Sequence, residues 1–174
     1  MKDPVRILLE EHTLLLKAIE TGRDIQEVSD DTIYSNLMND FIIFIRNYTE
    51  IYHHPKEESI LYPLLQNRSS AMSAEFIFEI CDNHEDFKSM IADIENHFIA
   101  CDYKLLRKDM LNYFELLTDH IKRENIIILS VASEILSTKE KENIYNLFEK
   151  IDKTNGEKEE LTKTLYKIIM KTLK

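Results

Sequence analysis

The chain is acidic and contains few residues that interrupt helices. It has 174 residues, of which 44% are hydrophobic, and a formal net charge of −10. This length and composition predict one domain with its own core. Two glycines and three prolines in the whole chain favour long helices. The negative charge argues against binding to nucleic acid or to an anionic membrane surface.

The sequence contains no segment typical of a membrane protein or a secreted protein. No apolar run approaches the length of a bilayer span. The first residues, MKDPVRILLEEH, are charged throughout, unlike those of a signal peptide. Cys81 and Cys101 form neither a CxxC motif nor a disulfide framework. We therefore expect a cytoplasmic protein.

Apolar residues at helical spacing and polar turns between them predict four helices. The first begins at Asp3 and Pro4, an N-cap residue followed by a first-turn proline. The second is expected to be interrupted or kinked near Pro55. The predicted helices cover about 4–25, 31–66, 71–99 and, after a turn at 100–102, the residues to about 137. Short connections between them predict an all-α fold, an up-down-up-down four-helix bundle over residues 1–137.

The remaining segment, residues 138–174, differs in composition from the bundle. It is rich in Lys and Glu and has a break at Thr154-Asn155-Gly156. From Glu159 onward, apolar residues recur on one side of a predicted amphipathic helix: Leu161, Leu165, Ile168, Ile169 and Leu173. This C-terminal helix is too short to form a core of its own. We expect it to pack on the bundle or to contact a protein partner.

Four of the six histidines interrupt the apolar faces of the predicted helices, one on each helix: His12, His54, His84 and His120. Two of them are followed by a glutamate four residues later, in the pairs His54–Glu58 and His120–Glu124. Residues i and i+4 lie on the same face of a helix. Two His-x-x-x-Glu pairs on different helices can therefore meet at one buried point.

The spacing of these histidines also places them at one depth in the bundle. In antiparallel neighbours, two residues at the same level are equally distant from the turn that joins the helices. The residue midway between His12 and His54 is Ile33, beside a polar break. The next two midpoints are Ser69 and Asp102, and both fall within predicted turns. The four histidines are thus predicted to form one layer.

Two buried glutamates in that layer would need cations, because an unpaired charge is costly inside a protein. Imidazole and carboxylate ligands suit iron, manganese or zinc. We predict two metal ions with His12, His54, Glu58, His84, His120 and Glu124 as ligands. If both glutamates bridge, each ion has four protein donors. A bridging oxo or hydroxo group makes five, and an octahedral ion keeps one position open for a small molecule.

Several neighbouring residues leave alternatives to this ligand set. His53 and Glu57 have the same spacing as His54 and Glu58 and could replace them. We favour His54, because residue 53 shares its predicted face with Arg46, Thr49 and Glu50. His97 has no acidic residue four positions later and is expected at the surface. Tyrosines near the layer are expected to pack in the core, although one of them could donate to a histidine or a ligand: Tyr48, Tyr52, Tyr62 and Tyr113.

These motifs resemble the hemerythrin-like, or HHE cation-binding, family. The resemblance covers residues 1 to about 137, and its most specific segments are HHPKEE and HIKREN. It implies a hemerythrin-like bundle with a non-haem di-iron centre. It also implies binding of dioxygen, nitric oxide or peroxide-related species, in oxygen sensing, iron homeostasis or repair of nitrosative damage.

The sequence differs from the oxygen-carrying hemerythrins at two ligand positions. Those proteins have another histidine one turn after the histidine of the third helix, where this chain has Lys88. They also have an aspartate five residues after the last histidine, whereas Glu124 follows His120 at four. In this respect the chain is similar to the branch with iron-cluster repair proteins and eukaryotic iron-sensing domains. We expect a di-iron protein that binds or senses small ligands. A di-iron enzyme or repair protein, and a metal-free interaction module, remain alternatives.

Overall fold

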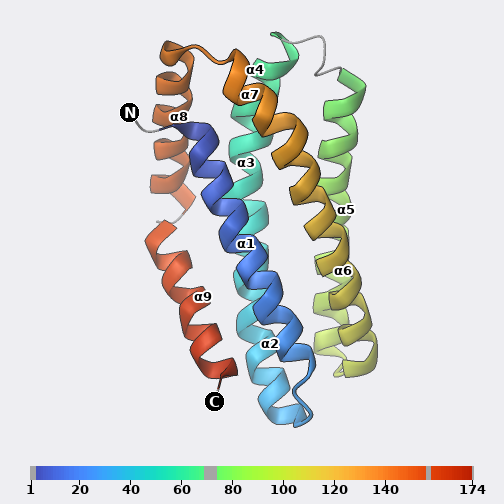
Figure 1. Cartoon of the computed structure of the whole chain (residues 1–174). Helices are drawn as coiled ribbons and strands as arrows, with labels where there is room; N and C mark the ends of the chain where they lie inside the picture. Colours follow the sequence, from blue (N-terminus) through green and yellow to red (C-terminus); the bar gives the residue numbers. More distant parts are fainter. Residues whose placement is uncertain (1–2, 69–73, 156–157, 174) are drawn as a thin grey trace.

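The computed structural model describes residues 3–68, 74–155 and 158–173. Four long helices run alternately up and down in a bundle, and two further helices lie along one side of it (Figure 1). The described residues contain no β-strand. The all-α fold with a helical bundle is therefore confirmed.

The first bundle helix is α1 (Pro4–Gln26) and the third is α5 (Ala74–Ile99). The other two contain segments of π-helix, named η1 to η3. The second bundle helix consists of α2 (Asp31–Arg46), η1 (Asn47–His53), α3 (His54–Lys56), η2 (Glu57–Leu61) and α4 (Tyr62–Gln66). The fourth consists of α6 (Tyr103–Arg123), η3 (Glu124–Leu129) and α7 (Ser130–Ile135). The two additional helices are α8 (Thr138–Asn155) and α9 (Lys158–Thr172).

Aspartate N-caps begin three of these helices. The Asp3 carboxylate accepts a hydrogen bond from the Val5 amide, and Asp30 accepts from two amides at the start of α2. Asp102 accepts from the Leu105 amide at the start of α6. Each side chain satisfies an amide that has no partner within the helix. The predicted turns before residues 31 and 103 are thus confirmed. Ser69, Ser70 and the predicted start of the third helix at 71 lie outside the described residues.

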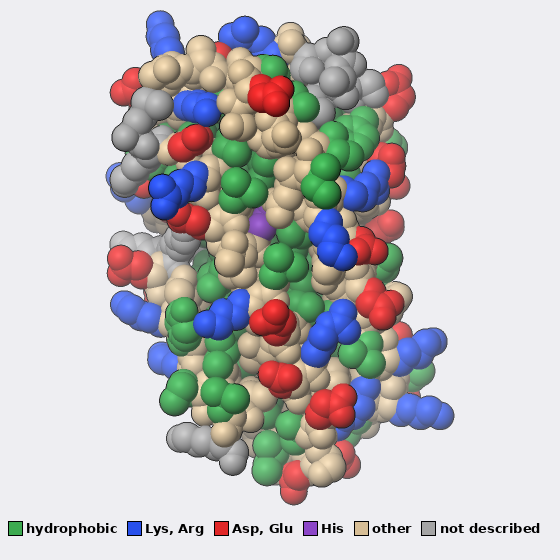
Figure 2. Space-filling view, in the orientation of Figure 1, with side chains coloured by type: hydrophobic (Ala, Val, Ile, Leu, Met, Phe, Trp, Pro, Cys, Tyr) green, Lys and Arg blue, Asp and Glu red, His purple; other side chains and the backbone are tan. Residues whose placement is uncertain are grey.

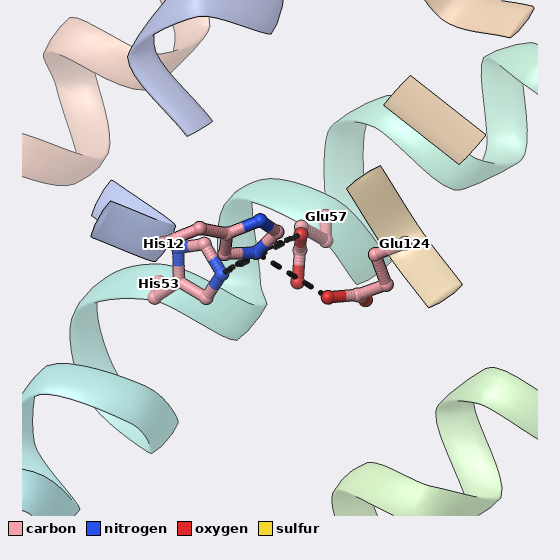
Figure 3. Close-up of side chains that lie close together, drawn as sticks. All are labelled: His12, His53, Glu57 and Glu124. Atoms are coloured by element: carbon pink, nitrogen blue, oxygen red, sulfur yellow. Dashed lines mark hydrogen bonds and ion pairs between the residues drawn. The ribbon is translucent and has the colours of Figure 1, made fainter. Parts of the chain in front are cut away.

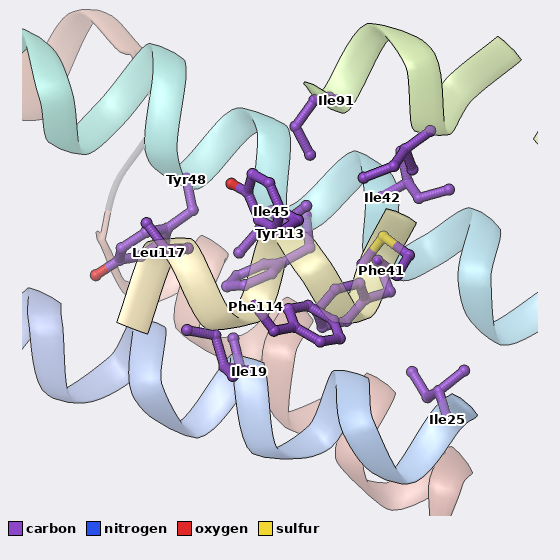
Figure 4. Packing of buried hydrophobic residues seen from close by; sticks show 14 of the residues in the cluster. Ile19, Ile25, Phe41, Ile42, Ile45, Tyr48, Ile91, Tyr113, Phe114 and Leu117 are labelled. Carbon is purple, nitrogen blue, oxygen red and sulfur yellow. The ribbon is translucent and has the colours of Figure 1, made fainter. Parts of the chain in front are cut away.

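The bundle has two apolar clusters, one on each side of the histidine level. The larger cluster lies towards the end where α1 meets α2, and includes Phe41, Tyr113 and Phe114 (Figure 4). The smaller cluster lies near α4 and α7 and includes Leu8, Tyr62 and Ile128. The main driving force for folding is burial of this apolar surface. The histidine layer therefore lies between two apolar regions.

The C-terminal segment packs on the bundle instead of extending away from it. Ile144 and Phe148 of α8 join the smaller cluster, and Leu165 and Ile168 of α9 join the larger one. Figure 1 shows both helices beside α1 and the second bundle helix. Of the two arrangements expected for the amphipathic segment, packing on the bundle is the one observed. The segment also contains α8, a second helix; Gly156 of the predicted break lies outside the described residues.

Among the described residues, no helix is both long enough and apolar enough to cross a bilayer.

Candidate metal centre

All four bundle helices contribute a side chain to one buried layer. His12 comes from α1, His84 from α5 and His120 from the end of α6. The second bundle helix contributes His53 at the end of η1 and Glu57 at the start of η2, and Glu124 begins η3. All six side chains are buried. On the face drawn in Figure 2, histidine reaches the surface in only one small area near the middle.

One half of the layer consists of His12 and His53. Their Nε2 atoms are 2.9 Å apart. Glu57 Oε1 lies 3.5 Å from each of these nitrogens, and Glu124 Oε2 lies 3.3 Å from that of His12. Figure 3 shows the two rings and the two carboxylates turned towards one another. Two nitrogen and two oxygen donors therefore converge on one point.

The other half has the same composition. The Nε2 atoms of His84 and His120 are 2.8 Å apart. Glu124 Oε1 lies 3.1 Å from His120 Nε2 and 3.6 Å from His84 Nε2, and Glu57 Oε2 lies 3.9 Å from His84 Nε2. Each glutamate thus directs one oxygen to each histidine pair. This is the arrangement that two bridging carboxylates require.

The donors fit a pair of cations. Both oxygens of Glu57 are buried and have no hydrogen-bond partner, although an uncompensated buried carboxylate is costly. In each half two Nε2 atoms face each other, so only a shared proton or a shared metal ion accounts for the contact. Two nitrogens that bind one ion at right angles, each at about 2.1 Å, lie about 3 Å apart. The observed separations of 2.9 and 2.8 Å match that distance.

The electric field of the two carboxylates acts on the histidines. Burial alone lowers the pKa of His12, but the carboxylates of Glu124 and Glu57 beside it outweigh this effect and raise that pKa well above its usual value. The same balance between burial and carboxylates raises the pKa of His84 to about 9. Burial raises the pKa of Glu124, but the histidines around it lower it well below its usual value. The layer thus stabilises positive charge, whether that charge is a proton or a metal ion.

Hydrogen bonds on the outer side hold three of the four rings with Nε2 facing inward. The Nδ1 atoms lie 2.6 Å from Asn125 Oδ1 for His12, 2.9 Å from Glu11 Oε2 for His53 and 2.7 Å from Glu58 Oε1 for His84. Each Nδ1 can therefore donate its proton outward and leave Nε2 free as a donor to an ion. Metal-bound histidines commonly have such partners.

Tyr62 is the tyrosine that reaches the centre. Its hydroxyl donates a hydrogen bond to Glu124 Oε1. Burial, together with the nearby carboxylates, raises its pKa well above the usual value, so it remains a donor at neutral pH. Of the four tyrosines singled out from the sequence, this one orients a carboxylate of the layer. The hydroxyls of Tyr48, Tyr52 and Tyr113 are buried without a hydrogen-bond partner.

Four of the six ligands expected from the sequence lie at the centre: His12, His84, His120 and Glu124. His54 and Glu58 occupy other places. The His54 ring stacks on the His84 ring, with centroids 3.8 Å apart and planes at 3°. The Glu58 carboxylate is 30% exposed and bonds to Nδ1 of His84. Glu58 therefore lies on the Nδ1 side of His84, away from the converging Nε2 atoms, and His54 lies on the face of that ring.

Residue 53, predicted to share a face with Arg46, Thr49 and Glu50, is buried. His53 and Thr49 are each 1% exposed, whereas Ile51, three residues before His54, is 44% exposed. The reason is the π-helix of η1 and η2 on either side of Pro55. A π-helical turn has about one more residue than an α-helical turn, so side chains beyond it rotate to a different face. Such segments occur often at functional sites.

Two outer partners, Glu11 and Asn125, were not expected from the sequence. Both are direct neighbours of residues in the layer, since Glu11 precedes His12 and Asn125 follows Glu124. Adjacent residues normally point to different sides of an α-helix, so periodicity alone gives no signal for them. Acidic or amide residues beside a buried histidine are the only hint in the sequence. His97, expected at the surface, is half-buried and pairs with Asp109 at 3.0 Å.

Comparison with known proteins agrees with this geometry. A search of curated proteins finds no match. The family model described as the Hemerythrin HHE cation binding domain matches residues 3–132, which include all six side chains of the layer. This match covers most of the chain, and the chain belongs to the hemerythrin HHE cation-binding domain family.

Proposed function

We propose that this protein holds two iron ions between four imidazoles and two carboxylates. The observation that supports this most directly is the division of each carboxylate: Glu57 and Glu124 direct one oxygen to His12 and the other to His84. Membership of a cation-binding family supports a metal site. The proposed ligands are His12, His53, Glu57, His84, His120 and Glu124.

In this proposal His53 and Glu57 replace His54 and Glu58 as ligands. Glu57 is fully buried without a hydrogen-bond partner, whereas Glu58 is partly exposed and already paired with His84. The role of Glu58 is then to hold the His84 ring through Nδ1. His54 supports the same ring by stacking on it.

The donor set suits iron because it combines imidazole and carboxylate without thiolate. Manganese and zinc accept similar ligands, so the metal must be measured. Each ion would have two nitrogen and two carboxylate oxygen donors from the protein. Iron with so few protein ligands offers an open coordination position for dioxygen, nitric oxide or peroxide.

We propose sensing or scavenging of such a molecule in the cytoplasm, where the two free cysteines would stay reduced.

A cavity between α5 and α6 supports access for a molecule of this size. It has a volume of 160 Å³ and reaches His120. Its apolar wall is formed by Phe87, Met90 and Leu116, and its remaining lining includes Asp86, Asp119 and Arg123. A cavity of this volume admits a small molecule and is smaller than the usual pocket for a drug-sized ligand. Of the six side chains of the layer, His120 is the one that lines it.

The test is metal analysis of protein purified without chelators from iron-supplemented cells, combined with absorption spectroscopy. We expect about two irons per chain, by the bridging geometry of the two carboxylates, and near-ultraviolet bands that change on reduction and on exposure to dioxygen or nitric oxide. His53→Ala should lose metal, whereas the adjacent His54→Ala should retain it. Two zinc ions would contradict iron as the metal. Protein without metal, or a His54→Ala variant that alone loses it, would contradict the proposed site.

A further inference from the structure

A buried lysine lies directly behind the metal layer. Lys56 has 0% exposure, and its ammonium is 2.6 Å from Glu11 Oε1 and 2.7 Å from Asp152 Oδ1. The same nitrogen lies 3.5 Å from the centre of the Tyr52 ring. A buried charge needs such compensation to be tolerated. The two carboxylates provide it from two different helices, α1 and α8.

Glu11 connects this lysine to the layer. While its Oε1 accepts from Lys56, its Oε2 lies 2.9 Å from Nδ1 of His53. Glu11 is fully buried, so water does not screen either contact. One uninterrupted series of polar contacts therefore runs from Asp152 through Lys56 and Glu11 to the ring of His53.

The outer end of this series lies in the C-terminal segment. Asp152 and Phe148 are one turn apart on α8. Phe148 is buried, with its ring 5.8 Å from the Lys56 ammonium, and the Asp152 side chain is only 26% exposed. Figure 1 shows α8 beside α1 and α3. The family match ends at residue 132, so α8 lies beyond it.

We propose that Lys56 and Asp152 are positioning residues of the metal centre, so that α8 is required for tight metal binding at the His12–His53 half. This inference rests on the proposed metal function. Asp152 holds the Lys56 ammonium, and Lys56 holds the Glu11 carboxylate where it accepts from His53. Such an acceptor fixes the orientation of the ring and makes Nε2 a better donor to a cation.

Removal of the Asp152 charge weakens metal binding in two ways. Among the described residues, Lys56 then has Glu11 as its one remaining anionic partner and draws that carboxylate away from His53. One unit of positive charge is also left uncompensated beside the cation site. Neither effect reaches the His84–His120 half directly, because Nδ1 of His84 has its own acceptor, Glu58. Coupling is reciprocal, so a metal ion at the first half must in turn hold α8 on the bundle.

The test is a titration of the full chain with zinc chloride, followed by NMR of ¹⁵N-labelled histidine. Zinc is diamagnetic and accepts these ligands, so each Nε2 resonance reports its own half. We expect Asp152→Asn to weaken zinc binding at His12 and His53 by about tenfold, the lower limit for residues behind a ligand. Binding at His84 and His120 should be unchanged, and Asp152→Glu should restore the first half.

The matched control is Asp40→Asn. Asp40 of α2 pairs with Lys171 of α9 at 2.5 Å, so this variant also removes an ion pair between the C-terminal segment and the bundle, but one without contact to the layer. It should bind zinc as the wild type does at both halves. The inference would be overturned by equal zinc binding in Asp152→Asn and wild type, or by the same loss at both halves. A wild type that binds no zinc pair would overturn the metal site and this inference together.

Discussion

The histidine layer and the larger apolar cluster differ in what stabilises them. In the apolar cluster, Phe41 and Phe114 meet edge to face with centroids 5.7 Å apart, and the contact is complete without any ligand. In the layer, Glu57 has two buried oxygens without hydrogen-bond partners. The cluster is a stable arrangement by itself, whereas the layer contains carboxylate oxygens that a bound cation would neutralise. The protein thus combines a self-sufficient scaffold with a buried group of polar side chains whose proposed role is to hold cations.

The sharpest test of this difference compares two adjacent glutamates. Glu57→Ala should abolish binding of both ions, because this side chain directs an oxygen to each half. Glu58→Ala should keep both ions, with binding weakened by about tenfold at the His84–His120 half through loss of the Nδ1 acceptor. Metal content per chain after gel filtration measures both effects.

Stability of the metal-free protein controls for misfolding in this comparison. Glu57→Ala removes a buried carboxylate that lacks hydrogen-bond partners, but also its ion-pair contacts with His12 and His53. Because these two effects oppose each other, metal-free Glu57→Ala should melt close to the metal-free wild type. Circular dichroism measures this. Equal metal content in the two glutamate variants would contradict the assignment of Glu57 as the ligand, and loss of metal from Glu58→Ala alone would show that Glu58 is the ligand.

The ambiguity between these glutamates also shows how far the sequence predicts the site. The stripes around His12, His84 and His120 lie on helices whose α-helical periodicity holds up to the layer, and the structure brings these three side chains together. His53 and Glu57, which the sequence offered only as alternatives, join them in place of His54 and Glu58 because residues 47–53 and 57–61 are π-helical. A change of helix type rotates the face of a residue without leaving a mark in the spacing of apolar residues.

The bundle itself was easier to predict, because its turns carry side-chain signals. Asp30 and Asp102 have N-cap chemistry, and the apolar spacing on either side requires a buried helix face. Contacts between distant parts of the chain have no such signal. The pairing of Lys56 with Asp152 depends on how α8 lies on the bundle, and nothing in either local sequence specifies it.

The apolar cluster can be weakened without loss of the metal site. Phe114 is fully buried, and Phe114→Ala should lower the free energy of unfolding by about 3–5 kcal/mol, through lost burial and the cavity left behind. The free energy of unfolding should fall by a similar amount with and without metal, and the variant should still bind two ions. Denaturant unfolding of both forms, with metal analysis, checks this. A variant that folds but binds no metal would show that the histidine layer depends on the packing of the larger apolar cluster.

The smallest expected effect is one of pH, and it also separates the two regions. In the metal-free protein, burial lowers the pKa of His12 and His84, but the carboxylates outweigh it and raise the pKa of His84 to about 9. A group with a raised pKa in the folded state contributes stability that is fully present below its unfolded value, about 6.5. That stability is lost as the pH rises through the folded value.

The metal-free protein should therefore lose stability between about pH 7 and pH 9. The metal-loaded protein should show the opposite trend, because an ion binds neutral imidazole and competes with protons, so its affinity rises with pH. The difference in melting temperature between the two forms should widen over this range. Phe114→Ala should show the same widening, since the layer is intact, and Glu57→Ala should show none. If the difference in melting temperature between the two forms of the wild type stayed constant with pH, protons and metal ions would not compete for these histidines. The layer could not then be the cation site.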